Sequence, residues 1–179
     1  ELKGLMLALS RIESSPRALL IRLNAYLCEH LDNRSFITMT YAIADLDAGT
    51  LTAARAGHTP LLLSCPSGAR LVVPDGMVLG LRLPGAHARF SEVLAEYTQP
   101  FGPGDAVVLY TDGITEAMNE AGELFGETAL CGVVDAHRDL DAAGIRERIV
   151  RDVRAFVSAA EPHDDMTMVV VKRTGMDAA

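Results

Sequence analysis

Apolar residues recur every three or four positions at the start of the chain, over residues 2–13 and again over residues 19–31. This spacing predicts two amphipathic helices that pack together. Ser15 is suited to cap the second helix and Pro16 to occupy its first position, because a proline there loses no hydrogen bond that the helix needs.

From Phe36 onward the pattern becomes typical of β-strands. Residues 36–46 are rich in β-branched and aromatic side chains, and a turn at residues 47–49 connects them to residues 51–57, which predicts a hairpin. A second hairpin is predicted over residues 61–65 and 69–73, then a loop rich in Gly and Pro, and another strand over residues 88–98. Residues 106–111 form a short apolar run, typical of a strand buried on both faces.

Helical spacing returns over residues 127–137 and 141–159, and the apolar run after Met166 predicts a last strand. In the second of these helices an apolar stripe lies opposite arginines and glutamates. Segregated strands and helices indicate an α+β fold with sheets and helices in packed layers. The pattern predicts one domain over residues 1–173 and a flexible tail at residues 174–179.

The net charge of the chain argues against some classes of function. The chain has 179 residues, 49% of them hydrophobic, and a formal net charge of -8. This acidity and the lack of a basic run argue against a nucleic-acid surface. No apolar stretch reaches membrane-spanning length and the start has no secretory signal pattern, so we expect no membrane insertion and a cytoplasmic location. Phosphate chemistry on so acidic a chain should require bound cations.

Asp112 directly follows the apolar run at residues 106–111. A carboxylate beside a buried strand is costly to desolvate, so it should be paired, serve as a cap or bind a metal. Gly113 allows close approach of backbone or ligand. On this pattern alone, Asp112 could serve either as the N-cap of a short helix at residues 114–119 or as a metal ligand.

Asp164 and Asp165 precede the last predicted strand. Adjacent like charges repel, and a bound divalent cation is one reason for two neighbouring carboxylates at this place. The alternative is that they form a cap or a turn where the loop enters the strand. Taken with Asp112, they indicate a site for Mg²⁺ or Mn²⁺, two of which can hold a hydroxide in line with a phosphorus atom. Such a site needs at least one further carboxylate, and no third strand-end aspartate of this kind stands out.

Three segments carry a resemblance to a known family: ARAGHTPLLL (54–63), PGDAVVLYTDGITEAMNEAGELFG (103–126) and HDDMTMVVVKR (163–173). In this order and spacing they resemble the PPM/PP2C-type serine/threonine phosphatases of the bacterial SpoIIE/RsbU-like group. The resemblance covers most of the chain. It implies a PP2C-like antiparallel β-sandwich flanked by helices, with a binuclear Mn²⁺ or Mg²⁺ site at the sandwich edge.

By position, the resemblance implies that Asp112 and Asp164 are metal ligands, with Asp165 as a neighbour or an alternative. The family also has an earlier segment resembling Gly-Asp-Val-Ser-Gly, whose aspartate bridges the two metals. The sequence begins after that segment. We therefore expect a fold lacking its N-terminal strand, weak metal binding and weak or no activity in the isolated chain, and an exposed sheet edge open to pairing, as in a dimer.

Four other polar residues have competing interpretations. A packing or hydrogen-bonding role is favoured for His58 over catalysis, and a loop position for His163 over that of an acid toward the leaving group. Glu116 and Asn119 are expected on the short helix after Asp112. The resemblance implies a regulatory switch there, and a solvated helix surface is the default.

The leading hypothesis is hydrolysis of phosphoserine or phosphothreonine on a protein by a metal-activated water, without a covalent enzyme intermediate. The resemblance implies a phosphorylated anti-sigma-factor antagonist of the STAS type as substrate, and an upstream sensor or receiver domain as regulator. The alternative is a non-catalytic phosphatase-like module that binds a signalling regulator. An aspartyl-phosphate transferase is disfavoured because Tyr110 occupies the position where that chemistry needs an aspartate.

Overall fold

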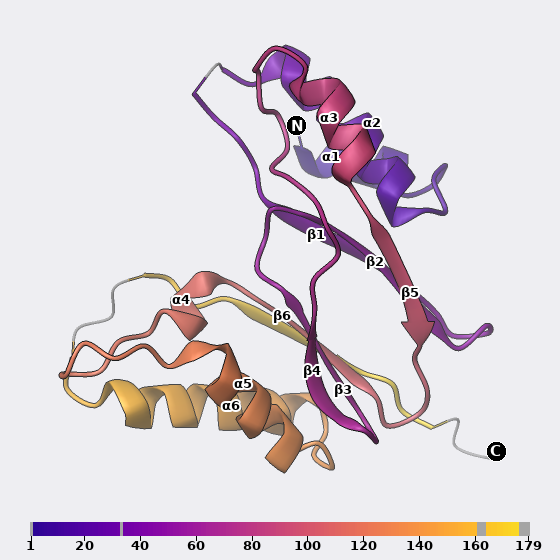
Figure 1. Ribbon diagram of the computed structural model, residues 1–179. Helices are drawn as coiled ribbons and strands as arrows, with labels where there is room; N and C mark the ends of the chain where they lie inside the picture. The colour runs from indigo at the N-terminus through magenta and orange to yellow at the C-terminus, as the bar shows by residue number, and fades with distance from the viewer. Residues whose placement is uncertain (1, 33, 161–163, 176–179) are drawn as a thin grey trace. The chain divides into compact units, whose positions relative to one another are not determined.

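The computed structural model describes residues 2–32, 34–160 and 164–175. These residues divide into two compact units, each with its own sheet and helices (Figure 1). The first unit comprises Glu1–His58 and Val73–Pro100, and the second comprises Thr59–Val72 and Phe101–Ala179. His163 and residues 176–179 of the predicted tail lie outside the described residues.

The first unit contains a three-stranded antiparallel sheet in the order β1-β2-β5. Its strands are β1 (Met39–Asp45), β2 (Thr50–Ala56) and β5 (Glu96–Pro100), and its helices are α1 (Leu2–Leu9), α2 (Pro16–His30) and α3 (Ala86–Val93). The first predicted hairpin is confirmed, since β1 pairs with β2 from Met39–Ala56 to Asp45–Thr50. Helix α1 ends at Leu9, so its predicted extension to residue 13 is wrong; hydrogen-bonded turns replace it.

Helix α2 begins where the sequence predicts. The Ser15 hydroxyl accepts a hydrogen bond from the Ala18 backbone N–H at 3.1 Å, and Pro16 is the first helical residue. Three leucines of α2, Leu19, Leu20 and Leu23, are fully buried and belong to the same core cluster as alanines of β2. Burial of this apolar face supplies the main stabilisation of the first unit.

The second unit contains a four-stranded antiparallel sheet in the order β4-β3-β6-β7. Its strands are β3 (Leu61–Cys65), β4 (Gly68–Val72), β6 (Ala106–Tyr110) and β7 (Met168–Lys172), and its helices are α4 (Asp112–Thr115), α5 (Gly126–Ala136) and α6 (Ala142–Val157). Strand β6 is central, as its apolar run predicts, and it pairs with β3 on one side and β7 on the other.

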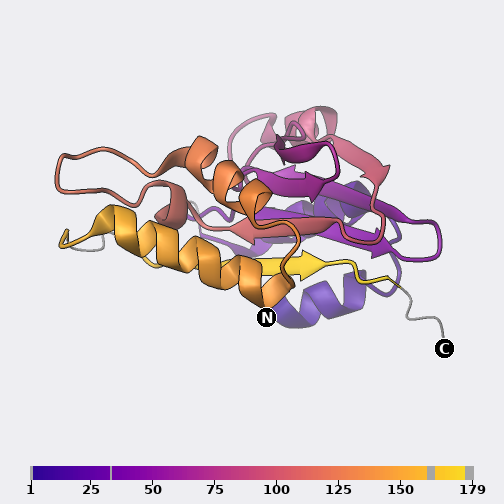
Figure 2. The ribbon, with the colours of Figure 1, turned by 90° about the horizontal axis from the view of Figure 1, so that it is seen from below.

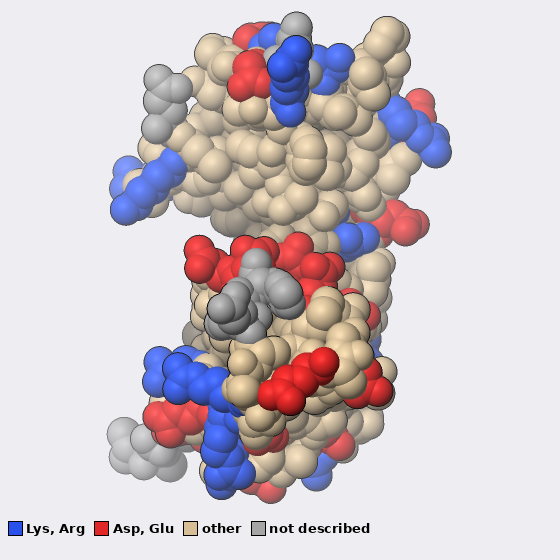
Figure 3. Space-filling view, turned by 90° about the vertical axis from the view of Figure 1, so that its left-hand side faces the viewer, with Lys and Arg blue, Asp and Glu red and all other residues tan. Residues whose placement is uncertain are grey.

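Helices α5 and α6 lie side by side and pack on one face of this sheet (Figures 1 and 2). Ile145, Ile149 and Val153 of α6 are fully buried against the sheet, which confirms the predicted apolar stripe. The opposite face of α6 carries charged residues, and side chains of both signs cover the surface of this unit (Figure 3). The two sheets with flanking helices confirm the predicted α+β class.

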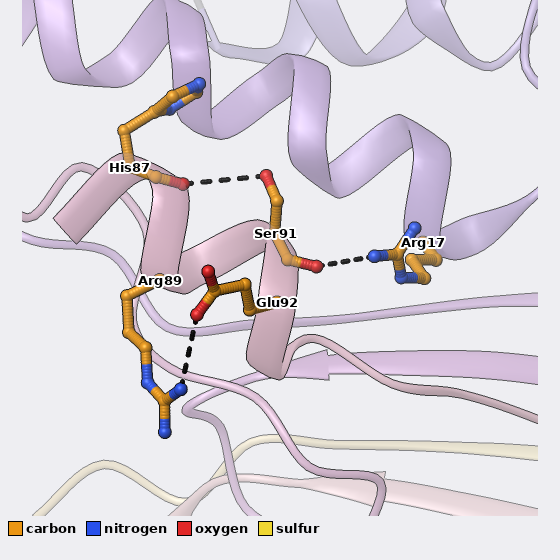
Figure 4. Close-up of polar contacts among 5 residues, drawn as sticks. All are labelled: Arg17, His87, Arg89, Ser91 and Glu92. Carbon is orange, nitrogen blue, oxygen red and sulfur yellow. Dashed lines mark hydrogen bonds and ion pairs between the residues drawn. The ribbon is translucent and has the colours of Figure 1, made fainter. Parts of the chain in front are cut away.

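Residues 88–98 do not form the predicted continuous strand. They contain most of α3, and β5 begins only at Glu96. Ala86, Phe90 and Leu94 are buried at four-residue spacing, which one face of a helix provides. Arg17 of α2 donates hydrogen bonds to the carbonyl of Ser91 (Figure 4) and to that of Leu94 at 2.7 Å.

These two carbonyls lie at the C-terminal end of α3, where a guanidinium is electrostatically favoured. The contact joins residues more than 70 positions apart. Local pattern therefore could not reveal the stabilisation that Arg17 gives the helix.

Among the described residues, the helices are too short or too polar to cross a membrane.

Phe90 anchors α3, and its removal should destabilise the first unit. Its side chain is 1% exposed, so Phe90→Ala should lower the free energy of unfolding by about 3–5 kcal/mol through lost burial and a residual cavity. Urea unfolding followed by circular dichroism measures this change. Leu83→Ala is the matched control, because Leu83 is 62% exposed and its truncation should leave the midpoint nearly unchanged. Equal shifts in both variants would contradict this packing.

Candidate functional site

The end of strand β6 places Asp112 at the surface. The strand is buried along almost its whole length, and Asp112 follows it after Thr111 and is exposed. Thr59, from the predicted 54–63 segment, donates a hydrogen bond to the carbonyl of Tyr110. This bond fixes the last residue of the strand and therefore the start of the TDG segment.

The segment that contains Asp164 and Asp165 docks directly on Thr111. The Thr111 hydroxyl donates to the carbonyl of Asp165 at 3.1 Å and accepts from the Thr167 N–H at 3.0 Å. The Thr111 N–H donates to the Thr167 carbonyl at 3.0 Å, which extends the pairing of β6 with β7. One threonine thus joins two acidic segments that are about 50 residues apart.

Gly113 allows the closest part of this approach. It is buried, and a Cβ at this position would lie 2.6 Å from the carbonyl oxygen of Asp165 and 3.5 Å from the carbonyl carbon of Asp164. A Cβ essentially never lies within 3.0 Å of another heavy atom, and the carbonyl oxygen that it would meet at 2.6 Å belongs to the backbone, which cannot turn aside as a flexible side chain can. Only glycine fits at this position without a shift of one of the two segments.

The three predicted aspartates all have exposed side chains at this junction. One oxygen of Asp112 accepts from the Gly113 N–H at 3.0 Å, and one oxygen of Asp164 accepts from the Asp165 N–H at 2.7 Å. Each of these two carboxylates keeps a second oxygen that accepts no hydrogen bond from a described residue.

Asp112 is not the N-cap of the short helix after β6. Helix α4 begins at Asp112 itself and covers only Asp112–Thr115, and Thr111 occupies the N-cap position without a side-chain cap bond. The helix predicted over residues 114–119 is therefore wrong in both its bounds and its cap. Asp112 lies in the first turn of α4, where its negative charge is favoured.

The side chains of Asp112 and Asp164 offer the type of ligand atom that a hard divalent cation prefers. Carboxylate oxygens are the preferred protein ligands of Mg²⁺ and Mn²⁺. Within the described part of the chain, however, His, Cys, Asp and Glu form no group of three or more that could hold a metal ion. Asp112 and Asp164 would thus supply part of a coordination shell, which water, phosphate or other carboxylates would complete.

Tyr110 lies directly before this site and stays neutral. Burial raises the pKa of its phenol, and the nearby carboxylate of Glu127 raises it further. The phenol packs in the core of the second unit, so it adds no charge beside Asp112.

A groove of about 1000 Å³ opens beside Gly113 and Asp164. Its lining comes from α4, the loop after it, the C-terminal end of α6 and the segment before β7, all within the second unit. The lining residues are Gly113, Glu116, Ala117, Met118, Leu124, Val153, Arg154, Val157, Ser158, Ala160, Asp164 and Met166. The groove is large enough for a peptide segment next to the aspartates.

The remaining candidates have structural contacts. His58 lies within 3.2 Å of the Thr38 hydroxyl through Nδ1, which agrees with the predicted hydrogen-bonding role. Glu116 and Asn119 lie beyond α4, so the expectation of a helix surface there is wrong. The amide oxygen of Asn119 accepts from the N–H groups of Ala121 and Glu123 and thereby shapes the loop.

Thr59 and Thr111 are the positioning residues that sequence reasoning missed. Both lie inside the segments that carried the resemblance, at residues 54–63 and 103–126. Their place in these segments was the signal that could have identified them. Their hydrogen-bond partners could not be identified in this way, because both hydroxyls donate to backbone carbonyls distant in sequence.

A curated protein is similar to this chain over most of the chain's length. The chain is 29% identical over 160 residues to the phosphoserine phosphatase RsbU of Bacillus subtilis, covering 88% of this chain and 45% of RsbU. It thus spans less than half the length of that relative.

Two solved structures show the same fold. The SiaA-PP2C domain of Pseudomonas aeruginosa matches with a TM-score of 0.78 at 18% identity, over 94% of this chain and 65% of that domain. A SpoIIE structure from Bacillus subtilis, the PP2C phosphatase domain with a fragment of the regulatory domain, matches with a TM-score of 0.74 at 17% identity, over 96% of this chain and 48% of that one.

The family model for stage II sporulation protein E matches residues 1–174, nearly the whole chain. The TDG and DDMT segments, joined through Thr111 and Gly113, lie within that match. The chain therefore belongs to the SpoIIE family of PPM/PP2C type, as its resemblance predicts.

Proposed function

We propose that residues 1–173 form part of a metal-dependent phosphatase domain that hydrolyses phosphoserine or phosphothreonine on a regulatory protein. The observation that carries this proposal is the junction of two acidic segments at Thr111 and Gly113, beside an open groove. The similarity to a protein named as a phosphoserine phosphatase supports the reaction type.

The proposed substrate is a phosphorylated anti-sigma-factor antagonist of the STAS type, acting in bacterial signalling in the cytoplasm. An upstream sensor or receiver domain would control the activity. The similarity to RsbU and membership of the SpoIIE family support this assignment.

In the proposed mechanism, Asp112 and Asp164 hold Mn²⁺ or Mg²⁺, with Asp165 as a neighbour or alternative ligand. When bound, a pair of such ions supplies positive charge for the phosphoryl oxygens and lowers the pKa of a water nucleophile. Thr111 and Gly113 hold the carboxylate-bearing segments in register, so the ligands need little rearrangement on binding.

The chain's own charge explains why cations are needed. Asp112, Asp164 and Asp165 are exposed in a protein of net charge -8, and a phosphorylated protein would be repelled from them. In this proposal water attacks phosphorus directly, and no side chain of the protein acts as the nucleophile.

A non-catalytic module that binds a signalling regulator is the second candidate. The observation that favours it is the lack of a three-residue ligand group within the described ranges. The two candidates differ in Mn²⁺ binding, because a purely binding module has no need of the ion.

Asp112→Asn should weaken Mn²⁺ binding in the full-length protein by at least about tenfold, since it removes a charged ligand. Electron paramagnetic resonance of free Mn²⁺ measures this without reference to activity, and phosphate release from a phosphoserine protein should fall in parallel. Asp139→Asn is the matched control. Asp139 is exposed between Arg138 and Leu140, whose carbonyls bind Lys172 at the far end of β7. Wild-type Mn²⁺ affinity in Asp112→Asn would rule out the ligand role.

Gly113→Ala should lower the rate of phosphate release by about 100-fold, because the added methyl group forces the TDG and DDMT segments apart. The thermal midpoint and circular dichroism spectrum report whether the fold survives. Gly132→Ala is the matched control, because this glycine lies within α5 without a positive φ and a Cβ added there meets nothing within 4 Å. Full activity in Gly113→Ala would show that the close approach is not required.

A further inference from the structure

The exposed face of α6 forms a second, smaller groove next to the candidate site. It has a volume of about 360 Å³ and is lined by Arg146, Glu147, Val150, Arg151 and Arg154. Residues 147, 150, 151 and 154 share one face of a helix because they are three or four positions apart. Three of the five lining residues are arginines, so this face is basic in a chain that is acidic as a whole.

Arg154 connects this face to the candidate site. It lines both the small groove on α6 and the larger groove beside Gly113 and Asp164. Val157 and Ser158, one turn further along, continue the lining of the larger groove. The two grooves therefore meet at Arg154; we call the surface formed by Arg146, Arg151 and Arg154 the α6 track.

The arginines of the α6 track are available to a partner. Arg146 and Arg151 are 57% and 68% exposed, and within the described ranges their ion pairs are with the carboxylates of their chain neighbours, at 3.8 Å from Glu147 and 3.7 Å from Asp152. Such long, exposed pairs contribute little energy. Arg154 is exposed and lines both grooves.

The larger groove adds apolar contacts to this charge. Leu124 and Met166 are 52% and 44% exposed there, and Met118 and Val157 complete an apolar lining. Methionine side chains adapt to different partners. The surface therefore offers arginines at one end and apolar contacts beside the aspartates at the other.

We propose that the α6 track docks an acidic, amphipathic segment of the phosphoprotein substrate, with its carboxylates on the arginines and an apolar residue in the larger groove. The proposal rests on the proposed function and adds the recognition of its substrate. Complementary charge accelerates association and sets the register of the phosphorylated residue, whereas the apolar contact slows dissociation. Arg146, Arg151 and Arg154 act as binding residues and not as catalytic ones.

The test is direct binding of a fluorescein-labelled peptide, followed by anisotropy with the full-length protein in Mn²⁺ buffer. The probe alternates glutamate pairs with leucines at helical spacing, and a second probe carries lysine in place of each glutamate. Replacing Arg146, Arg151 and Arg154 together by alanine should weaken binding of the acidic probe by at least about tenfold. The triple lysine variant should retain it, and neither set should weaken the lysine probe.

Arg148→Ala is the matched control, because Arg148 lies on the same helix but lines neither groove. It should leave the affinity for the acidic probe unchanged. Equal affinity of wild type and the triple alanine variant for the acidic probe would overturn the proposal, as would an equal loss in Arg148→Ala.

Enzyme assays separate this proposal from the proposed function. With p-nitrophenyl phosphate the double variant Arg146→Ala/Arg151→Ala should keep the wild-type rate, because these two arginines line the smaller groove and not the groove beside the aspartates. With an acid-flanked phosphoserine peptide, its kcat/KM should fall by about tenfold. If no variant releases phosphate but the binding difference persists, the phosphatase assignment fails and the docking surface stands.

Discussion

The close backbone approach between residues 111–113 and residues 164–167 is the constraint on which the candidate site depends. It requires a hydroxyl at Thr111 to satisfy the Asp165 carbonyl and the Thr167 N–H, and no side chain at Gly113. Without it, Asp112 and Asp164 would be carboxylates on unrelated loops. With it, two acidic segments separated by the whole α5–α6 region face solvent together, where β6 ends and β7 begins.

The rest of the second unit holds this junction in place. Strands β6 and β7 are paired over five residues, and the helices α5 and α6 bury an apolar stripe on the same sheet. The α6 helix has two roles, because Ile145, Ile149 and Val153 face the core whereas its arginines face solvent. Packing on one face of the helix thus positions the α6 track relative to the aspartates.

Elements with a strong local pattern were predictable from the sequence. Ser15 and Pro16 identify the start of α2, and the apolar run of β6 identifies a central strand that ends just before Asp112. Residues 88–93 were predicted as a strand, although the spacing of Phe90 and Leu94 fits one face of a helix. The hydrogen bonds from Arg17 to the end of this helix come from a residue distant in sequence and gave no local signal. The three aspartates could be identified by type and resemblance. Their register through Thr111 and Gly113 could not, because it depends on tertiary contacts with backbone atoms.

The measurement that tests this account most directly is a crystal structure of the full-length protein grown with Mn²⁺, with anomalous scattering data collected at the manganese edge. The account predicts an anomalous peak within coordination distance of carboxylate oxygens of both Asp112 and Asp164, with the Gly113–Asp165 contact preserved. Manganese bound elsewhere, or no peak at this junction at saturating Mn²⁺, would contradict it.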